Sequence, residues 1–171
     1  NNHRDSKIDS FFDAATTLAN SGFSIFRMGA IVNQRFINAH PQVFDYATNG
    51  MRTDFLDFFL GAHCEFSIST GSGWDNIPII FRRPVLYINF LPVFAPSALA
   101  LPLLIYFKQI FDQTSQSQID LKGIIERDIQ ASHNFFDYQN SDLKIKDLSS
   151  TELVEAFIEM AQRVEGTFVE T

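Results

Sequence analysis

The sequence predicts an α/β domain of three layers, in which helices cover both faces of a mainly parallel sheet. Segments of helical periodicity alternate with short apolar, β-branched runs, an order typical of βαβ units. In the clearest unit, an apolar run over 66–69 leads through the glycine-containing loop 70–73 into a helix-compatible segment, and a second apolar run follows Pro84. The 171 residues contain no repeat and no interior linker, so a single domain over 1–171 is expected.

The first half of the chain is expected to supply two helices and three strands. Each helix has a capping side chain before its first apolar residues, and each strand is a short apolar run beside a turn. The expected elements are a helix capped by Asp5 or Ser6 that runs to about Asn20, a strand over 23–28 that ends at Gly29, a shorter strand over 43–46, a helix capped by Thr53 that contains 55–62, and a strand over 66–69.

The second half is expected to alternate in the same way. Pro78 limits the helix over 74–81, because a proline in a helix interior removes a backbone donor and clashes with the preceding turn. Ser149 and Glu152 form a capping-box pattern before a long final helix. The remaining elements are strands over 85–88 and 103–107, a helix from Ile119 to about Gln130, and an edge strand over 143–146.

Composition excludes several classes of protein. The formal charge of −7 disfavours a nucleic-acid binder, since phosphate backbones need a basic face. The single cysteine, Cys64, cannot form an internal disulfide and fits the reducing cytoplasm. The uncharged segment 85–107 is long enough to span a bilayer, and a membrane-embedded protein is the alternative there. Its prolines, Pro92, Pro96 and Pro102, would leave backbone groups unpaired in lipid, so we expect a strand, a loop and another apolar segment.

The loop Thr70-Gly71-Ser72-Gly73 is the first candidate site. A glycine loop between a parallel strand and a helix binds phosphates in α/β proteins, because its backbone N–H groups face the ligand. The alternative is an ordinary tight turn, since Gly and Ser are common in loops. Asp75 complements the helix N-terminus in one interpretation and contacts a sugar hydroxyl in the other. The sequence thus predicts a nucleotide or phosphate pocket at this edge of the sheet.

Arg27 is the second candidate, because it ends an otherwise apolar strand just before Gly29. An arginine there is costly to bury, so it should face a ligand or a carboxylate. A salt bridge to Asp45 or Asp54 is the alternative to a ligand contact. In one parallel sheet, the end of the Arg27 strand and the glycine loop would open on the same edge, where a diphosphate could meet a guanidinium and backbone N–H groups together.

Other chemistries lack their residues. An NAD-linked oxidoreductase is disfavoured, because Asn76 stands at the third glycine of the fingerprint and Asn89 where a ribose-binding carboxylate is expected. No lysine follows the glycines as in a P-loop, and Ser72 lacks the outer glycines of a hydrolase elbow. The four histidines are scattered without metal-ligand spacing, so no metal site is expected.

Several motifs together resemble one known family. They are Arg27-Met28-Gly29, Asn38-Ala39-His40-Pro41, Arg52-x-Asp54-Phe55-Leu56, the run from Ser69 to Pro78, and Arg83-Pro84. On these motifs, and over nearly its whole length, the chain is similar to a bacterial family of glycosyltransferases found with surface-polysaccharide biosynthesis genes. Such enzymes resemble the GT-B architecture, in which two Rossmann-like domains face each other across a cleft. The chain looks like the C-terminal, donor-binding half, so the resemblance implies a longer enzyme with an acceptor-binding domain upstream.

The resemblance also implies the reaction, which is transfer of a sugar from a nucleoside diphosphate sugar to a glycan or lipid-linked acceptor, with no required metal or other cofactor. Arg27 would be the catalytic cation, and the donor would lie against Gly29, Thr70, Gly71, Ser72, Gly73 and Asp75. The enzyme would be cytoplasmic, without a transmembrane segment, and peripheral contact with a membrane is compatible with a lipid-linked acceptor. A non-catalytic nucleotide-binding or interaction domain of the same Rossmann-like shape is the alternative function.

Overall fold

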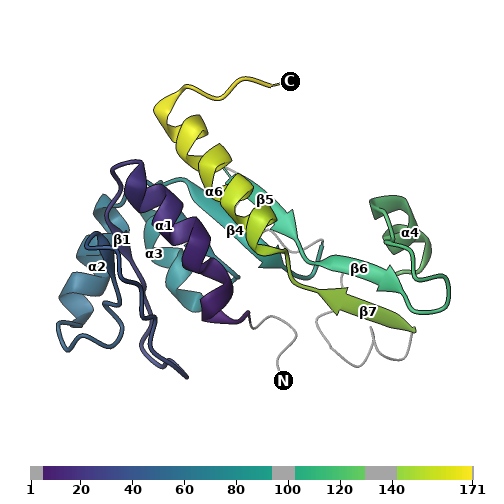
Figure 1. Ribbon diagram of the computed structural model, residues 1–171, viewed down its shortest axis with the longest axis horizontal. Helices are drawn as coiled ribbons and strands as arrows, with labels where there is room; N and C mark the ends of the chain where they lie inside the picture. Colours follow the sequence, from purple (N-terminus) through teal and green to yellow (C-terminus); the bar gives the residue numbers. More distant parts are fainter. Residues whose placement is uncertain (1–5, 94–102, 130–141, 171) are drawn as a thin grey trace.

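Helices and strands alternate along the chain in a computed structural model that describes residues 6–93, 103–129 and 142–170 (Figure 1). The described helices are α1 (Phe12–Asn20), α2 (Asp54–His63), α3 (Asn76–Ile80), α4 (Leu121–Glu126) and α6 (Ser150–Glu165), with short 3₁₀ helices at Ile8–Phe11 and Gly73–Asp75. The described strands are β1 (Ile25–Phe26), β2 (Val43–Phe44), β3 (Ser67–Ser69), β4 (Val85–Phe90), β5 (Leu103–Phe107), β6 (Gln109–Asp112) and β7 (Leu143–Lys146).

The central sheet consists of β3, β4 and β5, in that order, and all of its neighbours are parallel. Ile68 pairs with Leu86, and Leu86 pairs with Leu104, so β4 lies in the middle. Every residue of β4 is buried, as is usual for a parallel strand covered on both faces. These observations confirm the mainly parallel α/β sheet and the strands that the sequence predicts there.

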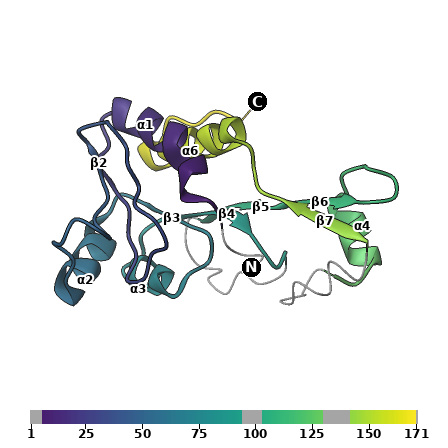
Figure 2. The same ribbon diagram turned by 60° about the horizontal axis from the view of Figure 1, so that its bottom comes forward.

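Helices cover both faces of this sheet, with α1 and α6 on one side and α2 and α3 on the other (Figure 2). Leu86 and Ile88 belong to a core with side chains of α1 and α6. Val85 and Tyr87 are buried on the opposite face, where Ile79 of α3 packs against them. Successive residues of a strand point to opposite faces, so β4 alone serves both cores. The protein therefore has the predicted three layers.

The first strand is shorter than predicted, and it lies in a different sheet. β1 pairs only with β2, as a separate two-stranded parallel sheet, whereas the expected strand covered 23–28. Arg27 still donates its N–H to Phe44 O (2.8 Å) and accepts from Ala47 N–H (3.0 Å), after which the chain turns away through Gly29 at a φ of 149°. The expectation that the Arg27 strand and β3 belong to one continuous sheet is therefore not met among the described strands.

The helix starts agree with the predicted caps at two places. Thr53 Oγ1 accepts the Leu56 N–H (3.1 Å) at the start of α2, and Ser149 and Glu152 form the expected capping box at the start of α6. The first helix is different, because Lys7 rather than Ser6 precedes the 3₁₀ turn that leads into α1. The other predicted cap, Asp5, lies outside the described residues.

One predicted short helix is confirmed, and another predicted helix is shorter than expected. The helix over 74–81 is a 3₁₀ turn followed by the single turn of α3, in agreement with the limit that Pro78 imposes. The helix from Ile119 begins instead after Asp120, whose side chain caps it by accepting the Gly123 N–H (2.8 Å), and α4 ends at Glu126. The expected end at Gln130 lies outside the described residues.

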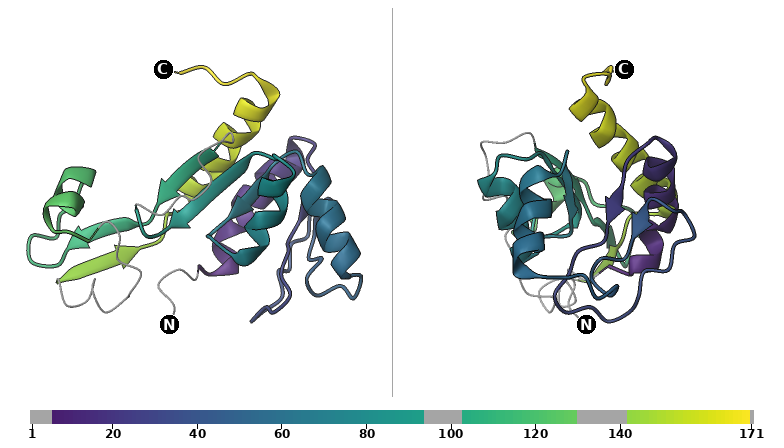
Figure 3. Two further views of the ribbon diagram at one scale, coloured as in Figure 1. Left: turned by 180° about the vertical axis from the view of Figure 1, so that it is seen from behind. Right: turned by 90° about the vertical axis from the view of Figure 1, so that its left-hand side faces the viewer.

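A third sheet, the antiparallel pair of β6 and β7, extends away from the central layers (Figure 3). Ile110 pairs with Ile145 in this hairpin, and α4 packs on it around a small apolar core that includes Leu91, Ile124 and Leu143. The edge strand over 143–146 is confirmed, but its partner, β6, was not predicted. The hairpin makes the sheet structure mixed rather than wholly parallel.

The uncharged segment 85–107 forms a strand at each end, β4 and β5. Pro96 and Pro102, which supported the prediction of a loop between them, lie outside the described residues. Within the described part of the chain, no helix has the length and apolar character needed to cross a bilayer.

Candidate functional site

The glycine loop lies at the carboxyl end of β3, beside the end of β4. Gly71 has a φ of +91°, and a Cβ atom built on it would lie 2.9 Å from Cε2 of Phe90. The backbone therefore approaches the Phe90 ring more closely than any larger residue allows, in a conformation that glycine adopts without strain. The loop is at the place where open parallel sheets bind ligands.

Asp75 joins the loop to two strands of the sheet. Its carboxylate accepts the Ser72 N–H at 2.8 Å and the Ser72 hydroxyl at 3.2 Å. It also accepts hydrogen bonds from the hydroxyls of Ser69 on β3 and Tyr87 on β4. The residue is 4% exposed. This arrangement favours the simpler sequence interpretation, in which Asp75 complements the start of its own helix.

Burial dominates the electrostatics of this cluster. It raises the pKa of Asp75 above the ordinary 3.8, although the hydrogen bonds from Ser69, Ser72 and Tyr87 act in the opposite direction. Burial and the neighbouring Asp75 carboxylate together raise the pKa of Tyr87 to about 12. Asp75 thus carries its charge at a cost, and neutral donors rather than a cation offset that cost.

Two of the loop's N–H groups are already engaged within the protein. Gly71 donates to Ser69 Oγ (3.0 Å), and Ser72 donates to Asp75. Gly73 and Trp74 are the first two residues of the 3₁₀ helix, so helix geometry supplies no partner for their N–H groups. Gly73 is exposed, and nothing lies within 4 Å of a Cβ built on it. An anion would therefore meet the N–H groups of Gly73 and Trp74 first, and not those of Gly71 and Ser72.

Arg27 forms the predicted alternative, a salt bridge to Asp45. Its Nη1 lies 3.1 Å from Asp45 Oδ1, and the two side chains are 13% and 12% exposed. The same carboxylate accepts the Phe36 N–H (2.9 Å) and the Thr48 hydroxyl. Asp54, the other carboxylate considered, is 97% exposed and lies 3.9 Å from Arg52 instead.

The structure does not join Arg27 to the glycine loop. Among the described residues, no hydrogen bond or ion pair connects Arg27 with 70–75, and β1 and β3 belong to different sheets. Gly29 shapes the turn after Arg27, where a Cβ would lie 2.7 Å from Val32 Cγ1. The predicted site residues therefore form two groups, one at the ends of β1 and β2 and one at the end of β3.

Sequence reasoning missed Ser69 and Tyr87, which hold Asp75. Ser69 offered a weak signal, because it stands two residues before Gly71, where a side chain commonly bonds a loop N–H. Tyr87 offered none, since it lies within the apolar run of β4 and its hydroxyl is needed only because Asp75 is buried beside it.

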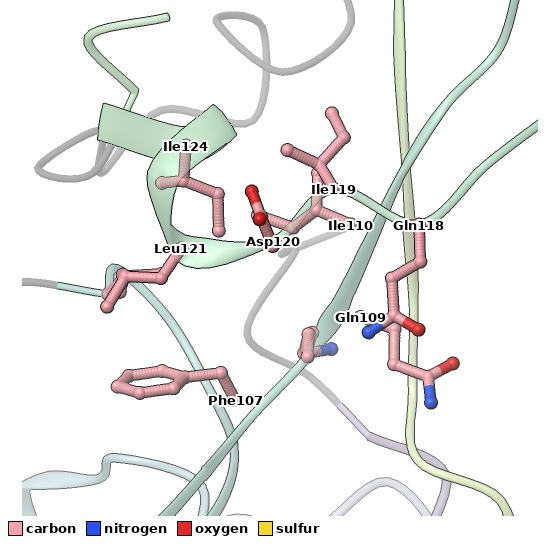
Figure 4. Close-up of a pocket in the computed structure, with 10 residues that line it drawn as sticks. Phe107, Gln109, Ile110, Gln118, Ile119, Asp120, Leu121 and Ile124 are labelled. Atoms are coloured by element: carbon pink, nitrogen blue, oxygen red, sulfur yellow. The ribbon is translucent and has the colours of Figure 1, made fainter. Parts of the chain in front are cut away.

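A cavity of about 240 Å³ lies elsewhere, between β6 and α4. Phe107, Leu121 and Ile124 lie on one side of it, with Gln109 and Gln118 on the other (Figure 4). None of the predicted site residues lines it. In the described ranges 6–93, 103–129 and 142–170, no group of three His, Cys, Asp or Glu side chains is placed to hold a metal ion.

No protein-family model, curated protein or solved structure matches the chain.

Proposed function

We propose that this chain is the Rossmann-like, C-terminal donor-binding part of a cytoplasmic GT-B glycosyltransferase. The observation that carries the proposal is the β3–loop–α3–β4 unit. It brings Gly71 against Phe90 and leaves Gly73 open to solvent at the carboxyl edge of a parallel sheet. The pattern of motifs that resembles polysaccharide-linked glycosyltransferases supports the same proposal.

In this proposal, the diphosphate of a nucleoside diphosphate sugar lies over Gly73, with the N–H groups of Gly73 and Trp74 directed at its oxygens. Fixed backbone donors stabilise negative charge as it develops, because they need no reorganisation during the reaction. The bond between the anomeric carbon and the diphosphate breaks, and the acceptor hydroxyl forms the new glycosidic bond. Asp75 keeps the loop in shape, through Ser72 and Tyr87, and does not touch the sugar.

Arg27 supplies the positive charge in this proposal. The salt bridge to Asp45 uses Nη1 and fixes the direction of the guanidinium, while its other nitrogens stay outside that bond. A cation held in this way is preorganised, and guanidinium groups bind diphosphate oxygens in pairs. The proposal therefore requires the donor to extend from the glycine loop to the end of β1.

Nucleotide binding to the chain tests the proposal. We expect saturation-transfer NMR with a panel of nucleoside diphosphate sugars to show binding of one or a few members. Gly73→Ala should abolish that binding without lowering the melting temperature, because the added methyl group meets open space. Lys122→Ala, at a position 81% exposed on α4, serves as the control and should bind as the wild type does.

The non-catalytic alternative gives a different result. A domain that only mediates interactions should show no preference within the panel, and Gly73→Ala should then change nothing. That outcome would reject a donor site at this loop.

A further inference from the structure

Asp75 forms a buried cluster with Ser69, Ser72 and Tyr87. The ionisation of this cluster plays no part in the proposed binding of the sugar donor. The carboxylate is 4% exposed, and it connects β3, the glycine loop and β4 through hydrogen bonds from Ser69, Ser72 and Tyr87. Two further hydrogen bonds hold the loop, from Gly71 N–H to Ser69 Oγ (3.0 Å) and from Asn76 Nδ2 to Gly73 O (2.9 Å). Asp75 is the buried ionisable group among the partners of the loop.

The groups that face Asp75 are neutral donors. Tyr87 on β4 is the only titratable one among those that shift its pKa, and Ser69 and Ser72 complete the set. The helix packed against this segment, α2, faces it through Gly61, next to Trp74 and Ile77. Three arginines of the nearby helices and loops have other partners: Arg27 with Asp45, Arg52 with Asp57, and Arg83 with the Ala62 carbonyl.

We propose that Asp75 is a proton-dependent latch for the glycine loop, which is held closed more firmly when Asp75 is protonated and loosens as Asp75 ionises. A closed loop buries the carboxyl group without a cation, whereas an open loop returns it to water, where the charged form is favoured. The closed loop therefore binds the proton more tightly. By linkage, each pH unit between the two pKa values changes the ratio of closed to open loop by about tenfold.

The hydrogen bonds of the closed loop are compatible with both protonation states. A protonated carboxyl group keeps one oxygen as an acceptor for the Ser72 N–H and gains a donor for the Tyr87 oxygen. Removing the Tyr87 hydroxyl takes away a donor that favours the charged form, so it should move the titration of Asp75 to higher pH. A pH-dependent affinity for the sugar donor would follow, and that consequence alone rests on the proposed function.

Trp74 allows a test without any nucleotide, because it is the only tryptophan of the chain and directly follows the loop, in the 3₁₀ helix Gly73–Asp75. We expect its fluorescence to titrate with a midpoint above 3.8, the ordinary value for Asp. The exchange of the Ser72 amide, corrected for intrinsic exchange, should rise over the same pH range. Asp75→Asn should abolish both responses, and Tyr87→Phe should move the midpoint upward.

The control is Asp54→Asn, a carboxylate 97% exposed on α2, which should leave the midpoint unchanged. If Asp75→Asn fails to fold, the shift in Tyr87→Phe and the carbon-13 titration of the Asp75 carboxyl group decide the matter. A midpoint at or below 3.8, or the same titration in Asp75→Asn, would overturn the latch. A chain that binds no nucleotide can still show the titration, so failure of the proposed function is distinguishable from failure of the latch.

Discussion

The side chain of Asn89 accepts the Leu148 N–H at 2.7 Å and so fastens the end of β4 to the segment that leads into α6. Its amide nitrogen donates to Ser6 Oγ at 3.1 Å. Asn89 is completely buried and has a φ of +50°, at a shift in the pairing of β4 with β5. The position that a ribose-binding carboxylate would occupy in a dinucleotide enzyme is therefore structural here.

Asn89→Ala should destabilise the protein by about 1–3 kcal/mol, because it leaves the buried Leu148 N–H without an acceptor. The positive φ adds to the loss, since alanine tolerates that conformation less well than asparagine. Urea denaturation measures the change. Asn49→Ala, which removes only an exposed bond to the Met51 N–H, is the control and should cost less than about 0.5 kcal/mol. Equal losses in the two variants would show that the Asn89 bonds contribute little.

The two glycines of the loop should respond differently to alanine. Gly71→Ala forces a residue with a Cβ to adopt a φ of +91° and places that Cβ 2.9 Å from the Phe90 ring. A strained backbone of this kind costs about 1–3 kcal/mol, so the melting temperature should fall. Gly73→Ala meets open space and should melt as the wild type does. Differential scanning calorimetry of both variants checks this, and a larger loss in Gly73→Ala would contradict the loop geometry.

Local sequence patterns predicted the elements whose signals lie within a few residues. The β3–loop–α3–β4 unit, the Thr53 cap and the Ser149 capping box all follow from neighbouring residues, and the structure contains them. The Asp45 salt bridge was one of two options, and the register of the strands explains it. Phe26 pairs with Phe44, so the residues that follow them, Arg27 and Asp45, lie level at the strand ends.

Long-range pairing explains what the sequence did not predict. The partner of β7 is β6, more than 30 residues earlier in the chain, and short apolar runs do not say which strands pair. Tyr87 belongs to an apolar run, so its bond to Asp75 depends on how the loop folds back over β4. The separation of Arg27 from the glycine loop has the same origin, since it depends on β1 leaving the central sheet.

The Asp45 carboxylate of the Arg27–Asp45 salt bridge makes the free energy of unfolding depend on pH. Burial raises the pKa of Asp45, but the hydrogen bonds from Thr48, Phe36 and Arg27 outweigh it, so the folded pKa lies below 3.8. The carboxylate therefore contributes stability that is fully present above 3.8 and is lost as the pH falls through the folded value. Asp45→Asn should cost about 1–3 kcal/mol at neutral pH and less in acid, as measured by urea denaturation at both pH values. A loss of stability in Asp45→Asn that is larger in acid than at neutral pH would contradict this prediction.

In urea denaturation, substitution of a buried apolar residue should lower the free energy of unfolding much more than substitution of an exposed one. Leu86 is 0% exposed in the core between β4 and the α1–α6 layer, so Leu86→Ala should cost about 2–5 kcal/mol through the cavity it leaves. Phe55 is 73% exposed on α2, where its ring stacks on that of Phe59. Phe55→Ala should therefore stay within about 0.5 kcal/mol of the wild type. A large loss at Phe55 would mean that this face of α2 is covered in solution.

Substitutions at Arg27 and Asp45 distinguish a role of Arg27 in donor binding from a role in stability, because each residue of the salt bridge can be changed on its own. If Arg27 binds the donor diphosphate, Arg27→Ala should weaken the affinity for a nucleoside diphosphate sugar at least tenfold, which is about 1.4 kcal/mol. Asp45→Asn removes the same salt bridge but keeps the guanidinium, so it should lower stability with a smaller effect on affinity. Titration calorimetry and urea denaturation of both variants give the two quantities. Should the two substitutions weaken binding equally, in proportion to their loss of stability, Arg27 acts only by holding the ends of β1 and β2 together.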